Sequence, residues 1–163
     1  MATGKAHALA TVIAGGVAAP ALVLLAHVPA GEGAAFAVGC LAGLLVNPDL
    51  DLRRFTHAEQ VVRDSTGPLG RFFAGLWYAF WWPYARLIPS HRHPLSHFPL
   101  LGTLLRLLYL GLVLSGFYLL ARLVINTLPP LAALAPALLQ PAAAWAAAGL
   151  ALVDALHALM DWM

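Results

Sequence analysis

The strongest constraint on the fold is a set of apolar segments, most of them long enough to be membrane helices. They cover residues 6–28, 34–50, 98–128 and 141–162, and few side chains within them are ionisable. Of the 163 residues, 61% are hydrophobic and only 10% are charged, whereas a soluble domain carries about 25% charged residues. The sequence therefore predicts one all-α integral membrane domain, a bundle of about four transmembrane helices.

The segments between these helices differ in character. Residues 51–70 are polar and predict a loop, and residues 131–140 form a short apolar piece bounded by prolines. Residues 71–89 are rich in Trp, Tyr and Phe, which is typical of the headgroup level of a membrane. We interpret residues 71–89 as an interfacial or re-entrant helix that Pro83 would interrupt.

The first apolar segment has two interpretations. Lys5 and the small residues near Ala30 resemble the ends of a signal peptide. The apolar run is long for that purpose, which favours a retained helix.

The distribution of Lys and Arg predicts the orientation of the chain. Residues 29–33 contain no Lys or Arg, whereas the basic residues gather before the first helix and between the second and third helices. Residues 51–70 are then a cytoplasmic loop, and both termini are cytoplasmic.

With this topology, every helix delivers metal-ligand residue types to the cytoplasmic face. The candidate ligands are His7, Asp49, Asp51, His91, His97, His157 and Asp161. Asp49, Asp51, His91 and His97 are the strongest of them, His7 and His157 come next, and Asp161 is either a ligand or a carboxylate that orients a ligating imidazole. Imidazole and carboxylate groups together suit Zn²⁺, Mn²⁺ or Fe²⁺, and their number allows one or two ions. The alternative is that these residues simply mark solvated helix ends.

Five further residues have open or modest roles. Asp154 is either a ligand or a carboxylate that orients a ligating imidazole, and His93 is either a ligand or a bystander. Arg106 either snorkels to the interface or faces a partner in the bundle. Ser96 is predicted to cap the following helix rather than act as a nucleophile. The lone Cys40 is predicted to be a small core residue, and a single cysteine excludes a CxxC metal site.

Three short stretches resemble a known family. They are Gly4-Lys5-Ala6-His7, Asn47-Pro48-Asp49-Leu50-Asp51, and Ser90-His91-Arg92 followed by Ser96-His97. Together they resemble a bacterial family of uncharacterised membrane proteins described as metal-binding, which is similar to the membrane-bound metal-dependent hydrolases. The resemblance implies metal or active-site roles for the seven candidate ligands above. The step from His91 to His97 is one residue longer than in the hydrolase pattern, and His93 stands where that pattern has a small residue.

The predicted function is a metal-dependent hydrolase at the cytoplasmic face of a bacterial inner membrane. Asp51 or Asp161 would act as general base, and Arg92 would bind an anionic group. The expected partners are the lipid bilayer and an anionic or lipid-like substrate, and the small net charge of +2 gives no sign of nucleic acid binding. The alternative is a non-catalytic, metal-stabilised membrane scaffold or a subunit of a larger complex. A transporter is disfavoured because only Arg106 is ionisable near mid-depth.

Overall fold

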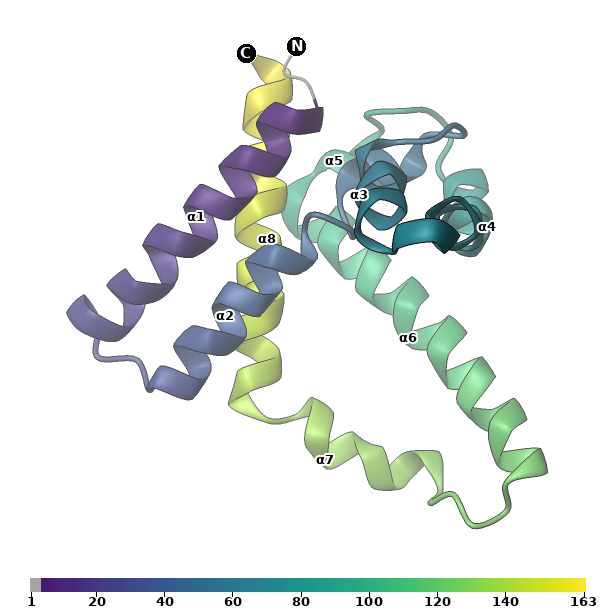
Figure 1. The fold of residues 1–163 in the computed structure, drawn as a ribbon. Helices are drawn as coiled ribbons and strands as arrows, with labels where there is room; N and C mark the ends of the chain where they lie inside the picture. The colour runs from purple at the N-terminus through teal and green to yellow at the C-terminus, as the bar shows by residue number, and fades with distance from the viewer. Residues whose placement is uncertain (1–3) are drawn as a thin grey trace.

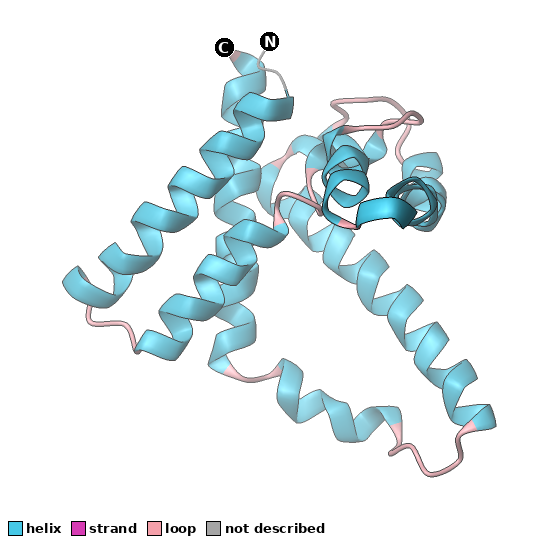
Figure 2. Ribbon diagram, in the orientation of Figure 1, coloured by secondary structure: helices cyan, strands magenta, loops and turns pink. Residues whose placement is uncertain are grey.

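The computed structural model describes residues 4–163, apart from the side chain of Leu138, and this part of the chain consists of helices joined by loops and turns, with no strand (Figure 2). The helices are α1 (Gly4–Leu25), α2 (Ala30–Ala42), η1 (Pro48–Asp51), α3 (His57–Ser65), η2 (Gly67–Leu69), α4 (Gly70–Leu87), α5 (Pro94–His97), α6 (Pro99–Val124), η3 (Leu131–Leu134), α7 (Ala135–Leu138) and α8 (Pro141–Trp162).

Helices α1, α2 and α8 pack together, and α6 joins α8 at one end only (Figure 1). From that end α6 slants away, and η3 and α7 connect its far end back to α8. The two termini lie side by side, and α3 and α4 sit beside the same end of the bundle. The end that holds both termini therefore gathers segments from the whole length of the chain.

The contact between α2 and α8 depends on glycine. A Cβ atom on Gly39 would lie 1.9 Å from the carbonyl oxygen of Ala146, and one on Gly149 would lie 2.1 Å from that of Phe36. The two backbones therefore touch. Cys40 is fully buried in this contact, and its Sγ donates to the carbonyl of Gly149 at 3.4 Å, which confirms its prediction as a core residue.

Three helices are long and apolar enough to cross a membrane: α1, α6 and α8. The predicted second span is shorter, because α2 has 13 residues and a helix of that length is about 20 Å long, less than the ~30 Å hydrocarbon core of a bilayer. Apolar side chains cover the outside of these helices, such as Leu112 and Leu123 on α6, which are 75% and 81% exposed.

The predicted helix over residues 34–50 is wrong at both ends. Helix α2 begins at Ala30 and ends at Ala42, and a turn then leads to the separate 3-10 helix η1. Pro48 explains why the helix does not continue through η1, because proline lacks an N–H and disfavours helical geometry at the preceding residue. Asn47 is accordingly extended, with φ −126° and ψ 168°.

The predicted loop over residues 51–70 contains helix α3. Its start is a capping box, in which Thr56 accepts from the backbone of α3 and Glu59 accepts from the backbone N–H of Thr56 at 2.6 Å. This Thr-x-x-Glu pattern is visible in the sequence and signals a helix start.

The aromatic segment forms one continuous helix, α4, so Pro83 does not interrupt it. Pro83 is exposed, while Trp81, Tyr84 and Ala85 are buried. The packing of this inner face offsets the backbone hydrogen bond that proline removes. Helix α6 also ends at Val124, four residues before the predicted boundary at residue 128.

A Gly39→Ala substitution tests the close contact of α2 with α8. We expect it to destabilise the protein by at least about 2 kcal/mol, because a backbone atom must move to admit the methyl group. Gly16→Ala is the matched control, since a Cβ there meets nothing within 4 Å and alanine favours helix by up to ~1 kcal/mol. Unfolding of both variants in detergent micelles, followed by tryptophan fluorescence, gives the comparison. Equal stability of the two variants would contradict the backbone contact.

Candidate metal centre

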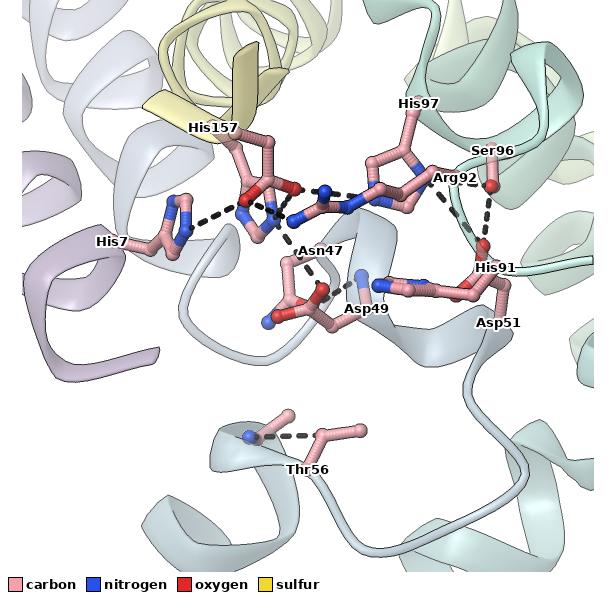
Figure 3. Close-up of polar contacts among 12 residues, drawn as sticks. His7, Asn47, Asp49, Asp51, Thr56, His91, Arg92, Ser96, His97 and His157 are labelled. Carbon is pink, nitrogen blue, oxygen red and sulfur yellow. Dashed lines mark hydrogen bonds and ion pairs between the residues drawn. The ribbon is translucent and has the colours of Figure 1, made fainter. Parts of the chain in front are cut away.

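The candidate ligands meet at the end of the bundle that holds both termini (Figure 3). Five segments supply them: the start of α1, helix η1, the loop after α4, helix α5 and the end of α8. The residues are His7 from α1, Asp49 and Asp51 from η1, His91 and Arg92 from the loop, His97 from α5, and His157 and Asp161 from α8.

Helix η1 presents two aspartates to different neighbours. Asn47 caps it by accepting from the backbone N–H of Asp49 at 3.1 Å, and Pro48 occupies its first turn. Asp49 then lies with its Oδ1 3.4 Å from His157 Nε2, while Asp51 Oδ1 lies 2.7 Å from His91 Nδ1. The Asn-Pro-Asp-x-Asp sequence therefore places two carboxylates against two different histidines.

Asp161 is the centre of the cluster. Its Oδ1 lies 3.1 Å from Arg92 Nη2 and 3.4 Å from His7 Nε2. Its Oδ2 lies 3.7 Å from Nε2 of both His97 and His157. The ring of His7 also stacks on that of His157, with centroids 3.8 Å apart.

Four of these residues, Asp49, His97, His157 and Asp161, offer ligand atoms that all lie within 4.8 Å of one another. We call them the metal group. The Nε2 atoms of His97 and His157 are buried and have no hydrogen-bond partner, although a buried polar atom without a partner is costly. Two unpartnered imidazole nitrogens beside two carboxylates fit a divalent cation.

A second set, Asp51, His91 and His97, shares His97 with the metal group. The Ser96 hydroxyl donates to Asp51 Oδ2 at 2.6 Å and lies 2.9 Å from His97 Nδ1. Since a hydroxyl has one proton to donate, Ser96 accepts from His97 Nδ1–H. This tautomer leaves the lone pair of His97 on Nε2, which faces the metal group. Asp51 and Ser96 therefore orient a candidate ligand, as carboxylates commonly do in metal sites.

The pKa values outside the candidate spans agree with this arrangement. Burial acts to raise the pKa of Asp51, but hydrogen bonds from His91, His97 and Ser96 hold it well below its usual range. The hydrogen bond between His91 and Asp51 in turn raises the pKa of His91. Burial also acts to raise the pKa of Asp49, but the nearby imidazole of His157 outweighs it and lowers that pKa. Both aspartates are thus ionised at neutral pH, as metal ligation or orientation requires.

Arg92 has a strained backbone. Its φ of 63° lies in the left-handed region, which costs a residue other than glycine about 1–3 kcal/mol. This conformation turns the Arg92 guanidinium toward Asp161, and the Arg92 side chain stays 34% exposed. The guanidinium therefore lies at the edge of the metal group.

Two residues with open or assumed roles prove to be structural. His93 accepts from the backbone N–H of Leu95 at 3.2 Å and caps α5, and it belongs to neither ligand set. The predicted capping role of Ser96 is wrong, because the cap residue of α6 is Phe98 and the carboxylate of Asp51 offers the Ser96 hydroxyl a stronger, charge-assisted bond.

Arg106 faces a partner inside the bundle instead of snorkelling. It is fully buried, forms an ion pair with Asp154 of α8, and donates from Nη1 to the carbonyl of Ser96 at 3.0 Å. Asp154 also accepts from Thr103. Asp154 therefore holds Arg106 and lies outside both ligand sets.

Comparison with known proteins agrees with this geometry. The sequence model of the family described as "Uncharacterized metal-binding protein (DUF2227)" matches residues 2–163. The chain belongs to this family. No curated protein and no solved structure matches the chain. Metal binding is thus supported both by membership of the DUF2227 family and by the two His/Asp sets.

An Arg106→Met substitution tests the buried ion pair. It leaves Asp154 charged, buried and unpaired, which costs about 3–5 kcal/mol. The double variant Arg106→Met/Asp154→Leu removes both charges, so we expect it to recover most of that loss. Arg122→Met is the control, because Arg122 is exposed on the same helix and surface substitutions change stability by about 0.5 kcal/mol or less. A double variant as unstable as the single one would show that the pair is not the cause.

Proposed function

We propose that the protein is a metal-dependent hydrolase held in a membrane, with its site at headgroup depth. The observation that carries this proposal is that the metal group is open on one side. Asp49 is 21% exposed at its side chain and lines a surface pocket, whereas the other three members are nearly buried. Structural metal sites are closed, and catalytic sites keep an open position.

The residues of the proposed site have distinct roles. Asp49, His97, His157 and Asp161 would hold the cation, whose Lewis acidity polarises the bond to be hydrolysed. Asp51 and Ser96 orient His97, because Ser96 accepts from His97 Nδ1–H and is itself held by Asp51. Asp51 is a poor general base, since its pKa is well below the operating pH. Asp161, the other predicted base, has one oxygen toward the two imidazoles and the other toward Arg92, which binds an anionic group of the substrate.

The membrane setting of the proposal rests on the three apolar helices and on the Lys and Arg pattern. The site lies where α1 begins and α8 ends, so it would be at the surface of a bilayer that these helices cross. The basic segment between α2 and α6 lies at the same end. We accordingly place the site and both termini on the cytoplasmic side of a bacterial inner membrane.

The first test measures metal content and turnover together. We expect purified protein to hold a near-stoichiometric transition metal by elemental mass spectrometry, and His157→Ala to lose most of it. His27→Asn is the control, because His27 is exposed, distant from the site, and at a φ of 55° that asparagine tolerates. Metal-loaded protein should hydrolyse a phosphoester or amide from a chromogenic panel, and Arg92→Ala should keep the metal but lose about 10–100-fold in kcat/KM.

A different result would favour the scaffold alternative. That result is a bound metal, no cleavage of any substrate in the panel, and a lower unfolding temperature as the sole effect of chelation. The metal would then hold helix ends together without catalysis.

Cysteine labelling tests the topology. Ser65 and Ser90 flank α4 and are exposed, whereas Thr127 is exposed at the far end of α6. We expect Ser65→Cys and Ser90→Cys to react with an impermeant maleimide from one side of the membrane, and Thr127→Cys from the other. Native Cys40 is fully buried and contributes little background. Labelling of Ser65→Cys and Ser90→Cys from opposite sides would place α4 across the bilayer and contradict the proposed topology.

A further inference from the structure

A surface pocket of about 550 Å³ opens beside the metal group. It lies between the first turn of α1 and the loop that joins η1 to α3, and its lining includes Lys5, Asp49, Arg54, Phe55 and His57. Its volume falls in the range of ligand sites, about 300–1,000 Å³. Asp49 and Thr56 both line the pocket.

The pocket continues inward to the candidate ligands. A smaller cavity of about 20 Å³ shares Gly4, Asp49 and His57 with it, and is also lined by His7 and His157. A space of this size holds about one water molecule. Asp49, a member of the metal group, therefore lines the pocket itself, and the small cavity beside it reaches His157, a second member.

The charge of the pocket is positive. Lys5 and Arg54 are exposed at its wall, and neither takes part in the ion pairs found among residues 4–163. Asp49 is the one acidic residue that lines the pocket, and its Oδ1 faces His157. Glu59 lies nearby in sequence but is buried and accepts from Thr56. Arg and Lys free of acidic partners favour an anion, and the guanidinium suits a phosphoryl group in particular.

One wall of the pocket is apolar. Phe55 is 54% exposed and stacks on Tyr78 at 5.3 Å between centroids, and Leu52 lies beside it in the lining. A phosphoryl group with an attached hydrocarbon chain would match both the cations and this wall. The start of α1, an apolar candidate span, is also part of the lining, which places the pocket at the depth of lipid headgroups in the proposed membrane setting.

We propose that this pocket binds the phosphoryl group of the substrate, with Lys5 and Arg54 as its cationic contacts and Phe55 against an attached chain. The proposal rests on the proposed function, because it takes the metal group as the site toward which the substrate is directed. The shared chemistry is a phosphoryl anion, which a lipid headgroup or a free phosphate can supply.

Calorimetric titration of the purified full chain in nonionic detergent tests the pocket. The probes are dihexanoyl phosphatidic acid, dihexanoyl phosphatidylcholine and inorganic phosphate. We expect phosphatidic acid to bind at least tenfold more tightly than phosphatidylcholine, whose trimethylammonium group meets the two cations. Lys5→Ala/Arg54→Ala should weaken phosphatidic acid binding at least tenfold.

The matched control removes the same charge elsewhere. Arg63→Ala/Arg71→Ala deletes two exposed arginines that lie outside the pocket, and it should change the affinity less than twofold. An equal loss in both double variants would overturn the proposal, because it would show general electrostatic attraction. Absence of binding to phosphatidic acid and to inorganic phosphate would overturn it as well.

The remaining arms separate the sources of the phosphoryl group. A lipid is supported if phosphatidic acid binds more tightly than inorganic phosphate and if Phe55→Ala lowers its affinity to that of phosphate. Equal affinities, both lost in Lys5→Ala/Arg54→Ala and unaffected by Phe55→Ala, support a free phosphate ester in the same pocket.

Metal content, measured on the same samples, keeps this test apart from the proposed function. Lys5→Ala/Arg54→Ala should retain the metal of the wild type. If the wild type holds metal and cleaves an amide but binds neither phosphoryl probe, the pocket proposal fails alone. If it binds phosphatidic acid through Lys5 and Arg54 but holds no metal, the proposed hydrolase fails and the anion pocket stands.

Discussion

The buried ion pair between Arg106 and Asp154 is the interaction on which the site depends. Two charges inside a helix bundle are costly unless they meet each other, so the pair fixes how α6 lies against α8. Arg106 also donates to the carbonyl of Ser96. One guanidinium thus joins two candidate membrane helices to the segment that carries His97, and holds His97 opposite His157 on α8.

The candidate ligands and the buried ion pair lie at one end of the bundle, and large apolar side chains cover much of the outside of α1 and α6. Exposed apolar side chains on long helices are compatible with helices that lie in a membrane. The contact between α2 and α8 needs no polar groups, because glycine lets these backbones touch. The strain at Arg92 is located where the fold brings a cation to the edge of the metal group.

The sequence predicted the helical class, the candidate ligands and their common end, because apolar length and Lys/Arg placement are local properties. Its errors have local causes too. The predicted helix over 34–50 extended too far because hydropathy continues past Gly43, whereas the chain turns after Ala42 and Pro48 begins the separate helix η1. Helix α3 was not predicted, although the capping box of Thr56 and Glu59 marks its start in the sequence. Ser96 was assigned to a cap because serine commonly caps helices, and only the fold shows Asp51 beside it.

By itself, the sequence determined that the chain is helical, that its charges are few, and that His and Asp residues cluster near helix ends. Family membership adds metal binding. Only the tertiary structure decided which carboxylate does what: Asp154 neutralises Arg106, Asp51 orients His91 and His97, and Asp49 and Asp161 face the free imidazole nitrogens. The physical reason is that these roles depend on partners distant in sequence, such as Arg106 for Asp154, Ser96 for Asp51 and His97 for Asp161, which packing alone brings together.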